Sequence, residues 1–336
     1  MADSEDLVPT TFHPTTAAVK LREITAALPD AIGAVGAVGA VDAPSHRGKV
    51  RDVFEKGQEV LLVATDRVSA FDVVLGTIPL KGQLLTEQSA YWLARAAEIA
   101  PTHLLERVDA AILRCQKAQP FAVELVVRGH LAGSLLREPP ETRGHSYGVK
   151  VDPATRAWAA LPSPIITPTT KEAVGVHDQP CSLQDLVSSG RISPTHLDQV
   201  VETALALFEM GRAHADAQGL ILVDTKYEFG LVAGAVVVID EVHTADSSRF
   251  WLKDSYSARV AAGEAPEMLD KENLRRWLLA RGFAGEGMPP ELDAAVRTEL
   301  ATHYWTLSER VLGKAFSPAS GGGSRVAGVV DRWLRT

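Results

Sequence analysis

The chain has 336 residues, 46% of them hydrophobic and 23% charged, and a formal net charge of −8 at pH 7. This length predicts one large domain or, more readily, two modest domains with a substantial core. The acidic balance argues against a nucleic-acid or membrane partner, because surfaces that follow phosphates are usually basic.

The cysteines and the N-terminal stretch indicate the compartment. Cys115 and Cys181 are the only cysteines, too few for a disulfide framework and without metal-site spacing. The N-terminal stretch lacks the basic and apolar regions of a signal peptide, and no run approaches a membrane span. We therefore expect a soluble, cytoplasmic protein.

Residues 1–45 are expected to form a tail, a short amphipathic helix over 17–28 and a linker. The linker contains the tract AIGAVGAVGAV at 31–41. Its glycines follow G-x-x-G-x-x-G, without the G-x-G-x-x-G order or the preceding strand of a dinucleotide-binding loop. We interpret the tract as a flexible, low-complexity insertion rather than a phosphate loop.

A small β-rich domain is predicted over residues 46–120. Its apolar runs predict strands, and one segment repeats its apolar residues near helical spacing. The strands are expected at 48–55, 59–65, 71–75 and within 103–128, and the helix at about 84–99.

A larger α+β domain is expected over residues 121–315. Ser193 and Pro194 suit the N-cap and the first position of a long helix over 194–217. Because strands and helices are segregated by region, without strict β–α–β alternation, the pattern predicts an α+β fold with two domains. Two further helices are expected at about 270–281 and 290–313, followed by a Gly-Ser linker and tail at 316–336.

Two strand-like runs, GLILVDTKYEFG and AVVVIDEVH, carry the strongest functional signal. Strand alternation places Asp224, Lys226 and Glu228 on one face. If residues 232–234 form a tight hairpin, Asp240 falls roughly opposite Lys226 and close to Glu228. Mg²⁺ held by carboxylates and substrate phosphates is a usual reason to gather such charges, and a nearby lysine can meet a phosphate. The alternative is a salt-bridge lattice on a solvated sheet face.

Other blocks bring cations together with glycine and hydroxyl groups. GKVRDVFE places Gly48 before a strand whose Lys49 and Arg51 share one face and can follow a triphosphate. ELVVRGHLAGS delivers Arg128 to a glycine-containing turn and Ser134 to a helix start, which suits capture of a carboxylate or phosphate. TDRVSAFD, IPLKGQLLT and IITPTTKE have the composition of ligand-facing loops. The sequence offers no Ser/His/Asp arrangement, Cys/His pair or zinc spacing.

Eight blocks resemble, in the same order, the motifs of the SAICAR synthetase family. They are GKVRDVFE, ATDRVSAFD, LKGQLLTEQSAYWL, ELVVRGHLAGS, ITPTTKE, DTKYEFG, DEVHTADSSRFW and LDKENLRRWL. The resemblance runs from about residue 48 to 279, and eight ordered motifs are far more specific than one. Ala245 departs from the proline that the family often has there.

The resemblance implies an ATP- and Mg²⁺-dependent ligase of de novo purine biosynthesis. It joins the carboxylate of the nucleotide CAIR to the amine of L-aspartate and gives SAICAR, ADP and phosphate. The implied path runs through an acyl phosphate and needs positioning and charge neutralisation more than a protein nucleophile. The implied fold is a two-domain α+β fold with ATP in the interdomain cleft, similar to ATP-grasp and kinase-type enzymes.

The resemblance also implies roles for single residues. Catalytic roles fall on Lys226, Glu228 and Asp240, the two carboxylates as Mg²⁺ ligands. ATP contacts are implied at Gly48, Lys49, Val50, Arg51 and Lys226, with adenine against the segment 115–124. The CAIR pocket is implied to comprise Arg128, Ser134, Asp178, Arg249, Lys271 and Arg275. Possible aspartate contacts are Ser69, Lys81 and Lys171.

Three alternatives stay open: another ATP-dependent carboxylate–amine ligase, a kinase-like small-molecule phosphotransferase, and a catalytically silent nucleotide-binding regulator. A ligase requires the amine for turnover, a phosphotransferase does not, and a regulator binds ATP without consuming it. The expected partners are small molecules, CAIR and L-aspartate, without nucleic acid or membrane. The expected assembly is a monomer or a small homo-oligomer.

Overall fold

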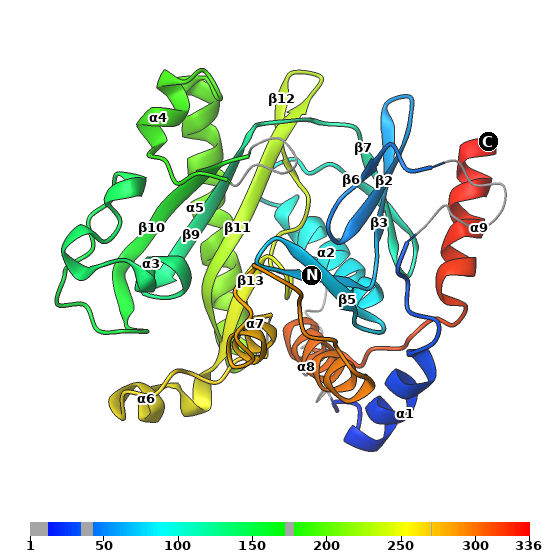
Figure 1. The fold of residues 1–336 in the computed structure, drawn as a ribbon. Coiled ribbons are helices and arrows are strands. Elements are labelled where there is room, and N and C mark those ends of the chain that lie inside the picture. Colours follow the sequence, from blue (N-terminus) through cyan, green and yellow to red (C-terminus); the bar gives the residue numbers. More distant parts are fainter. Residues whose placement is uncertain (1–12, 35–42, 172–177, 270) are drawn as a thin grey trace, which may run out of the picture.

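The computed structural model describes residues 13–34, 43–171, 178–269 and 271–336, whose arrangement is drawn in Figure 1. Strands gather in two main sheets, one built from residues 46–116 and the other from residues 119–252. Helices lie around these sheets rather than alternating with every strand (Figure 1). This arrangement confirms the predicted α+β class.

The first sheet is antiparallel, with the order β1-β2-β3-β7-β6. Its alternate residues face two different cores: Val60 packs toward α2 and the main core, whereas Leu61 and Val63 pack on the opposite face. The elements are β1 (His46–Arg47), β2 (Arg51–Lys56), β3 (Glu59–Ala64), β6 (Leu104–Asp109) and β7 (Ile112–Gln116), with β4 (Arg67–Ala70) paired to β5 (Val73–Thr77).

Helix α2 spans Lys81–Ala96 and begins three residues before the predicted start at about 84. Its first turn is fixed by Asp66, whose Oδ1 accepts a 2.8 Å hydrogen bond from the backbone N–H of Gly82. Gly82 also packs directly on the preceding sheet, since a Cβ there would lie 2.3 Å from the Ala64 carbonyl oxygen. The polar contact and the glycine extend the helix beyond its apolar repeat.

The second sheet has the order β10-β9-β11-β12, and β8 and β13 also pair with β11. On one face of β11, Thr225 and Tyr227 are fully buried in the main core beneath α5. Helix α5 spans Pro194–Ala217 and is capped by Ser193, as predicted. The strands are β8 (Gln119–Pro120), β9 (Val123–His130), β10 (Ala160–Thr170), β11 (Leu220–Val232), β12 (Ala235–Ile239) and β13 (Ser248–Leu252).

The hairpin between β11 and β12 is one residue tighter than predicted. Val232 pairs with Ala235, so only two residues form the turn, both with positive φ, as a type I′ turn requires. Glu228 consequently pairs with Ile239. Asp240 comes directly after Ile239, so its position along β11 differs by one residue from the predicted one. The predicted position of Asp240 opposite Lys226 is therefore wrong. Asp240 has φ 65° and leaves the ladder, so strand alternation does not fix its side chain.

The other predicted helices are present, whereas the short helices at Leu183–Ser188 and Lys253–Ala261 were not predicted. Helices α1, α7 and α8 lie at the predicted places with slightly shorter bounds, and α8 packs on α1 and α2. None of the described helices is long and apolar enough to cross a membrane. The bounds are α1 (Ala17–Ala27), α3 (Gly133–Arg137), α4 (Leu183–Ser188), α6 (Lys253–Ala261), α7 (Glu272–Leu279) and α8 (Ala294–Leu312), with 3₁₀ turns at Pro140–Thr142 and His145–Tyr147.

The stretch 316–336 was predicted as a Gly-Ser linker and tail, and helix α9 occupies Gly322–Arg335 of it. Val326 and Val330 are fully buried in a small core with Phe54 and other residues of the first sheet. Figure 1 shows α9 on the outer side of that sheet. A Cβ at Gly322 would lie 2.2 Å from the Asp30 carbonyl oxygen, so this glycine serves a close-packed junction rather than a flexible connection.

The described part of the Gly-Ala-Val tract is built into the same core. Ile32 is 2% exposed, and its N–H donates a 2.8 Å hydrogen bond to Asp66. The carbonyl of Gly33 accepts a 2.8 Å hydrogen bond from Arg67. Residues 35–41 of the tract lie outside the described residues.

Candidate active site

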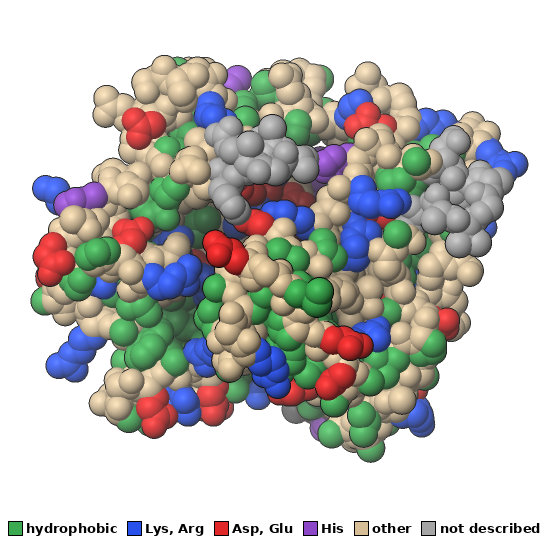
Figure 2. Space-filling view, viewed as in Figure 1, with side chains coloured by type: hydrophobic (Ala, Val, Ile, Leu, Met, Phe, Trp, Pro, Cys, Tyr) green, Lys and Arg blue, Asp and Glu red, His purple; other side chains and the backbone are tan. Residues whose placement is uncertain are grey.

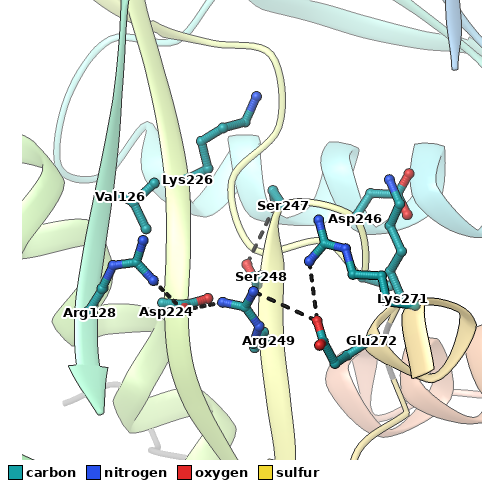
Figure 3. Close-up of a pocket in the computed structure, with 12 residues that line it drawn as sticks. Val126, Arg128, Asp224, Lys226, Asp246, Ser247, Ser248, Arg249, Lys271 and Glu272 are labelled. Atoms are coloured by element: carbon teal, nitrogen blue, oxygen red, sulfur yellow. Dashed lines mark hydrogen bonds and ion pairs between the residues drawn. The ribbon is translucent and has the colours of Figure 1, made fainter. Parts of the chain in front are cut away.

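A polar cavity of about 220 Å³ lies on the face of the second sheet that carries Asp224 and Lys226 (Figure 3). Strand alternation brings these two side chains to one face, as predicted. Among the residues that line the cavity, five are cationic and three are anionic. The cations are Arg128 on β9, Lys226 on β11, Arg249 on β13, and Lys271 and Arg275 at α7; the anions are Asp224, Asp246 and Glu272.

Asp224 lies between two arginines in this cavity (Figure 3). The Nη1 of Arg128 is 3.2 Å from Asp224 Oδ2, and Nη1 of Arg249 contacts the same oxygen. Arg128 also donates from Nε to Thr167 and from Nη2 to Ser134, at 2.8 and 3.0 Å. Glu272 lies 3.8 Å from Arg249 and 3.2 Å from Arg275. Three guanidinium groups therefore share two carboxylates, which leaves a net positive charge for an anionic ligand.

A glycine makes room for the second of these arginines. Gly133 has φ 59°, and a Cβ there would lie 2.5 Å from Nη1 of Arg249. The Gly-Ser pair of the ELVVRGHLAGS block therefore has two separate tasks. Gly133 leaves space for the guanidinium group of Arg249, and the hydroxyl of Ser134 accepts a hydrogen bond from Arg128.

Lys226 connects the cavity to a pair of carboxylates. Its Nζ donates to Glu124 at 2.8 Å and to Glu228 at 2.7 Å, and Lys171 contacts the other oxygen of Glu228. Burial opposes ionisation of Glu228, but Lys226 and Lys171 together hold its pKa well below the usual range. Burial, followed by the charge of Glu228, raises the pKa of Glu124 despite Lys226. Two carboxylates therefore share one ammonium on this face.

Arg51 reaches from the first sheet to the second. Its Nη1 contacts Asp240, and its Nη2 lies 3.0 Å from Glu241 Oε2. His103 donates its backbone N–H to the Val238 carbonyl, and Glu228 pairs with the next residue, Ile239, directly before Asp240. Burial and then the charge of Arg51 lower the pKa of the His103 ring to about 3, while Glu228 opposes this. The two predicted metal-binding carboxylates thus lie by the same junction. In Figure 2, acidic and basic side chains meet in the hollow at the centre of the molecule.

Lys49 lies at a second cavity of about 330 Å³ that also contains Ser69 and Asp72. Lys49 is half exposed and contacts Asp72. Lys271 and Arg275 line both cavities, so the two adjoin. The predicted shared face of Lys49 and Arg51 is wrong, because β2 begins only at Arg51 and the two cations contact carboxylates of different loops.

Gly48 and Val50 make backbone contacts beside these cations. Gly48 closes a turn by donating its N–H to the Arg51 carbonyl at 2.8 Å. The carbonyl of Val50 accepts from the Thr65 N–H at 3.0 Å. These bonds fix the chain from which Lys49 and Arg51 project.

Two predicted ligand residues lie away from the main cavity. Lys81 is fully buried and pairs with Asp246 behind the cavity wall. Asp178 is exposed and is not among the residues that line the cavity. Within the described residues, no group of three or more potential His, Cys, Asp or Glu metal ligands occurs.

Several charged residues of the site were given no role from the sequence. Asp224 could have been assigned from strand alternation, because it shares the face of Lys226 and Glu228. Glu124 could have been found only from the register, which sets Tyr227 against Leu125 and thereby aligns the next pair, Glu228 and Glu124. Asp246 and Glu241 lie in the DEVHTADSSRFW block, without a spacing that marks their contacts.

Comparison with known proteins gives consistent matches. Residues 44–290 match the profile of the family described as SAICAR synthetase. The chain is 43% identical over 274 residues to the phosphoribosylaminoimidazole-succinocarboxamide synthase of Cytophaga hutchinsonii, covering 81% of this chain and 88% of that protein. It is 39% identical over 299 residues to the enzyme of the same name from Legionella pneumophila strain Paris, covering 86% and 95%. The solved SAICAR synthase of Saccharomyces cerevisiae complexed with SAICAR aligns with a TM-score of 0.74 and 28% identity, over 85% of this chain and 100% of that chain.

Proposed function

The chain belongs to the SAICAR synthetase family, and from that premise we propose how its residues divide the work of the reaction. The enzyme is a phosphoribosylaminoimidazole-succinocarboxamide synthase, a carbon–nitrogen ligase of purine biosynthesis. It joins the carboxylate of CAIR to the amine of L-aspartate with consumption of ATP. The division of residues among CAIR, ATP and metal is the proposal.

CAIR occupies the cavity around Arg128 and Arg249 in this proposal. The observation that carries it is the convergence of five cationic side chains on one small cavity that has only three carboxylates. Among the residues that the structure describes, none forms a hydrogen bond or ion pair with the Lys271 ammonium, whereas its backbone carbonyl accepts from Arg275, so the side-chain charge is available for a ligand. A phosphate and a carboxylate, both present in CAIR, are the groups that such cations bind. Ser134 acts through Arg128, and Asp178 stays a proposed contact.

ATP phosphates meet Lys49, Arg51 and Lys226, and the backbone of Gly48 and Val50 lies against the nucleotide. The adenine lies against the segment 115–124. Lys226 lines the CAIR cavity and also contacts Glu228. It therefore joins the proposed CAIR cavity to the proposed metal-binding carboxylate, where the transferred phosphoryl group would meet the CAIR carboxylate.

Glu228 and Asp240 fit a site for Mg²⁺. The lowered pKa of Glu228 keeps it ionised, and carboxylate oxygens are the hard ligands that Mg²⁺ prefers. Mg²⁺, when bound, neutralises charge on the ATP phosphates. The cations that contact these two carboxylates, Lys226, Lys171 and Arg51, would then be released toward phosphate oxygens.

Positioning is the chemical contribution of these residues. The arginine pocket holds CAIR so that its carboxylate faces the phosphoryl group, and an acyl phosphate forms before the aspartate amine attacks. L-Aspartate enters beside Ser69 and Lys171, with Lys81 acting from behind through Asp246. None of these steps requires a protein nucleophile.

The test is product formation by the purified protein with ATP, Mg²⁺, CAIR and L-aspartate, followed by mass spectrometry. SAICAR is expected only when all are present. ATP consumption that does not depend on aspartate would instead indicate a phosphotransferase, and the absence of any SAICAR would contradict the proposal. We also propose a cytoplasmic monomer or small homo-oligomer, which cell fractionation and light scattering would check.

A further inference from the structure

The carboxylate of Asp246 joins the substrate cavity to two helices behind it. Its Oδ2 lies 2.6 Å from Nζ of Lys81 on α2, and its Oδ1 accepts a 2.6 Å hydrogen bond from the hydroxyl of Tyr304 on α8. Lys81 is fully buried, Tyr304 is 1% exposed, and the ammonium lies 5.6 Å from the tyrosine ring centre. Asp246 also lines the cavity together with Lys271 (Figure 3).

The loop that carries Asp246 is anchored at further points. The N–H of Ala245 donates a 2.9 Å hydrogen bond to Gln88 on α2. Ser247 accepts from the N–H of Thr244 at 3.0 Å. These bonds fix the turn from which Ser247 and Ser248 line the cavity.

Helix α8 supports the opposite wall of the cavity as well. Nδ2 of Asn273 on α7 lies 3.3 Å from the ring Nδ1 of His303 on α8. The segment that matches the family profile ends at residue 290, and α8 begins only at Ala294. A helix outside the matched segment therefore contacts both the Asp246 loop and α7, which carries Arg275 and is preceded by its N-cap residue Lys271.

We propose that Asp246 is a positioning residue of the CAIR cavity, which Lys81 and Tyr304 hold in the cavity wall beside Lys271, so that its carboxylate supports the Lys271 ammonium where the substrate anion binds. The assignment of the anion to CAIR rests on the proposed function. The positioning role concerns the binding of any anion in the cavity, so the affinity for a simple anion such as sulfate measures it.

Lys271 is the cavity cation that depends on Asp246. Burial lowers the pKa of Lys271, and the carboxylate of Asp246 opposes that shift. Without the Asp246 charge, Lys271 loses its proton at a lower pH, and a neutral amine no longer attracts an anion. Asp246 and Glu241 favour the Lys271 ammonium, whereas Lys81 and Arg275 disfavour it. The other charged residues of the two cavities that Lys271 lines are Arg128, Asp224, Lys226, Arg249, Glu272, Lys49, Asp72 and Arg137.

Two variants test the proposal. In Asp246→Asn, the pH above which the KM for CAIR rises should shift down by about one unit or more, while the KM for ATP stays unchanged. This variant leaves the Lys81 charge buried without a partner, which can prevent folding. Tyr304→Phe keeps both charges and removes only the hydroxyl, and should raise the KM for CAIR about threefold or more with kcat nearly kept.

The matched control is Tyr91→Phe on α2, whose hydroxyl accepts from Arg95 away from the cavity. Its KM values should equal those of the wild type. Should Asp246→Asn fail to fold, the double variant Lys81→Met/Asp246→Asn removes the buried pair together. In the double variant, the pH above which the KM for CAIR rises should also shift down. The shift should be smaller than in Asp246→Asn, because the Lys81 charge that opposes the Lys271 ammonium is absent too.

Sulfate binding separates this inference from the proposed function. Calorimetric titration of sulfate from about pH 7 to about pH 10 reads the charge of the cavity without any turnover. Affinity should decline at a lower pH in the folded Asp246 variants than in the wild type, whether or not the wild type makes SAICAR. An unchanged pH profile in folded Asp246 variants, together with wild-type KM values in Tyr304→Phe, would overturn the positioning role.

Discussion

Arg128 and Asp224 stand opposite each other on the neighbouring strands β9 and β11, with Nη1 of the arginine 3.2 Å from Oδ2 of the aspartate. Thr167 and Ser134 hold the other nitrogens of the same guanidinium. The fork of Arg128 is therefore fixed from three sides. A substitution that keeps the charge but removes the fork separates geometry from charge at this site.

Arg128→Lys should raise the KM for CAIR about tenfold or more, because a lost charge-assisted contact is worth roughly 1.5–3 kcal/mol. ATP affinity, measured without CAIR, should hardly change. Lys49→Met should give the reverse pattern. Titration calorimetry of ATP and of CAIR against each variant measures both patterns. The surface variant Arg212→Lys is the control and should keep both affinities. Loss of ATP with retention of CAIR in Arg128→Lys would show that the two assignments are reversed.

Glu228→Gln and Asp240→Asn should each raise the Mg²⁺ concentration needed for half-maximal activity, by about tenfold or more. The amides keep the shape of the side chain but lack the charge that the metal prefers. The measurement is initial rate against Mg²⁺ at saturating ATP. Glu106→Gln, an exposed change on β6, is the matched control. A metal role is refuted if both variants keep the wild-type Mg²⁺ dependence.

His243 predicts an acid-sensitive fold. Burial lowers the pKa of this fully buried ring from 6.5 to about 3, although its hydrogen bond to Leu207 opposes the shift. Between these values the unfolded chain binds a proton that the folded chain does not, so the free energy of unfolding falls as pH falls. Each such histidine contributes a slope of at most about 1.4 kcal/mol per pH unit. Asp66, whose pKa burial raises to about 6, acts in the opposite sense.

The comparison of His243→Gln with the wild type removes the contribution of Asp66. Urea unfolding from about pH 7 to about pH 4.5 should show a shallower decline in the variant. His145→Gln changes an exposed ring and should keep the wild-type slope. Equal slopes in His243→Gln and the wild type would contradict the assignment.

Helix α9 offers a matched pair of stability variants. Val330 is fully buried against the first sheet, whereas Arg332 is exposed on the same helix. Val330→Asp should lower the free energy of unfolding by about 3 kcal/mol or more, because a carboxylate enters an apolar core. Arg332→Asp should cost less than about 1 kcal/mol. Equal effects in chemical denaturation would show that α9 does not complete the core.

Local patterns predicted those features that local physics decides. Ser193 and Pro194 specify the start of α5 through capping and a preset φ, and no distant contact is needed. The alternation along β11 likewise brought Asp224 and Lys226 to one face. The arginines of the cavity were found through their motifs, each of which lies on a different strand or helix.

Features that depend on distant packing were missed. The Gly-Ser stretch before α9 has the composition of a linker, and only its contact with Asp30 shows that it is a junction. The hairpin register changed by one residue because Ala233 adopts a positive φ that its side chain does not predict. Tyr304 could not be connected to Asp246, since the two are far apart in sequence and share no pattern.

The position of α9 has a consequence for the order in which the chain folds during translation. The first sheet is complete by residue 116, yet the helix that covers its outer face emerges from the ribosome about 200 residues later. Until then the apolar side chains of Phe54, Leu61 and Val63 face water or other nascent chains. We therefore expect the first sheet to reach its full stability only after α9 has been synthesised and has packed on it.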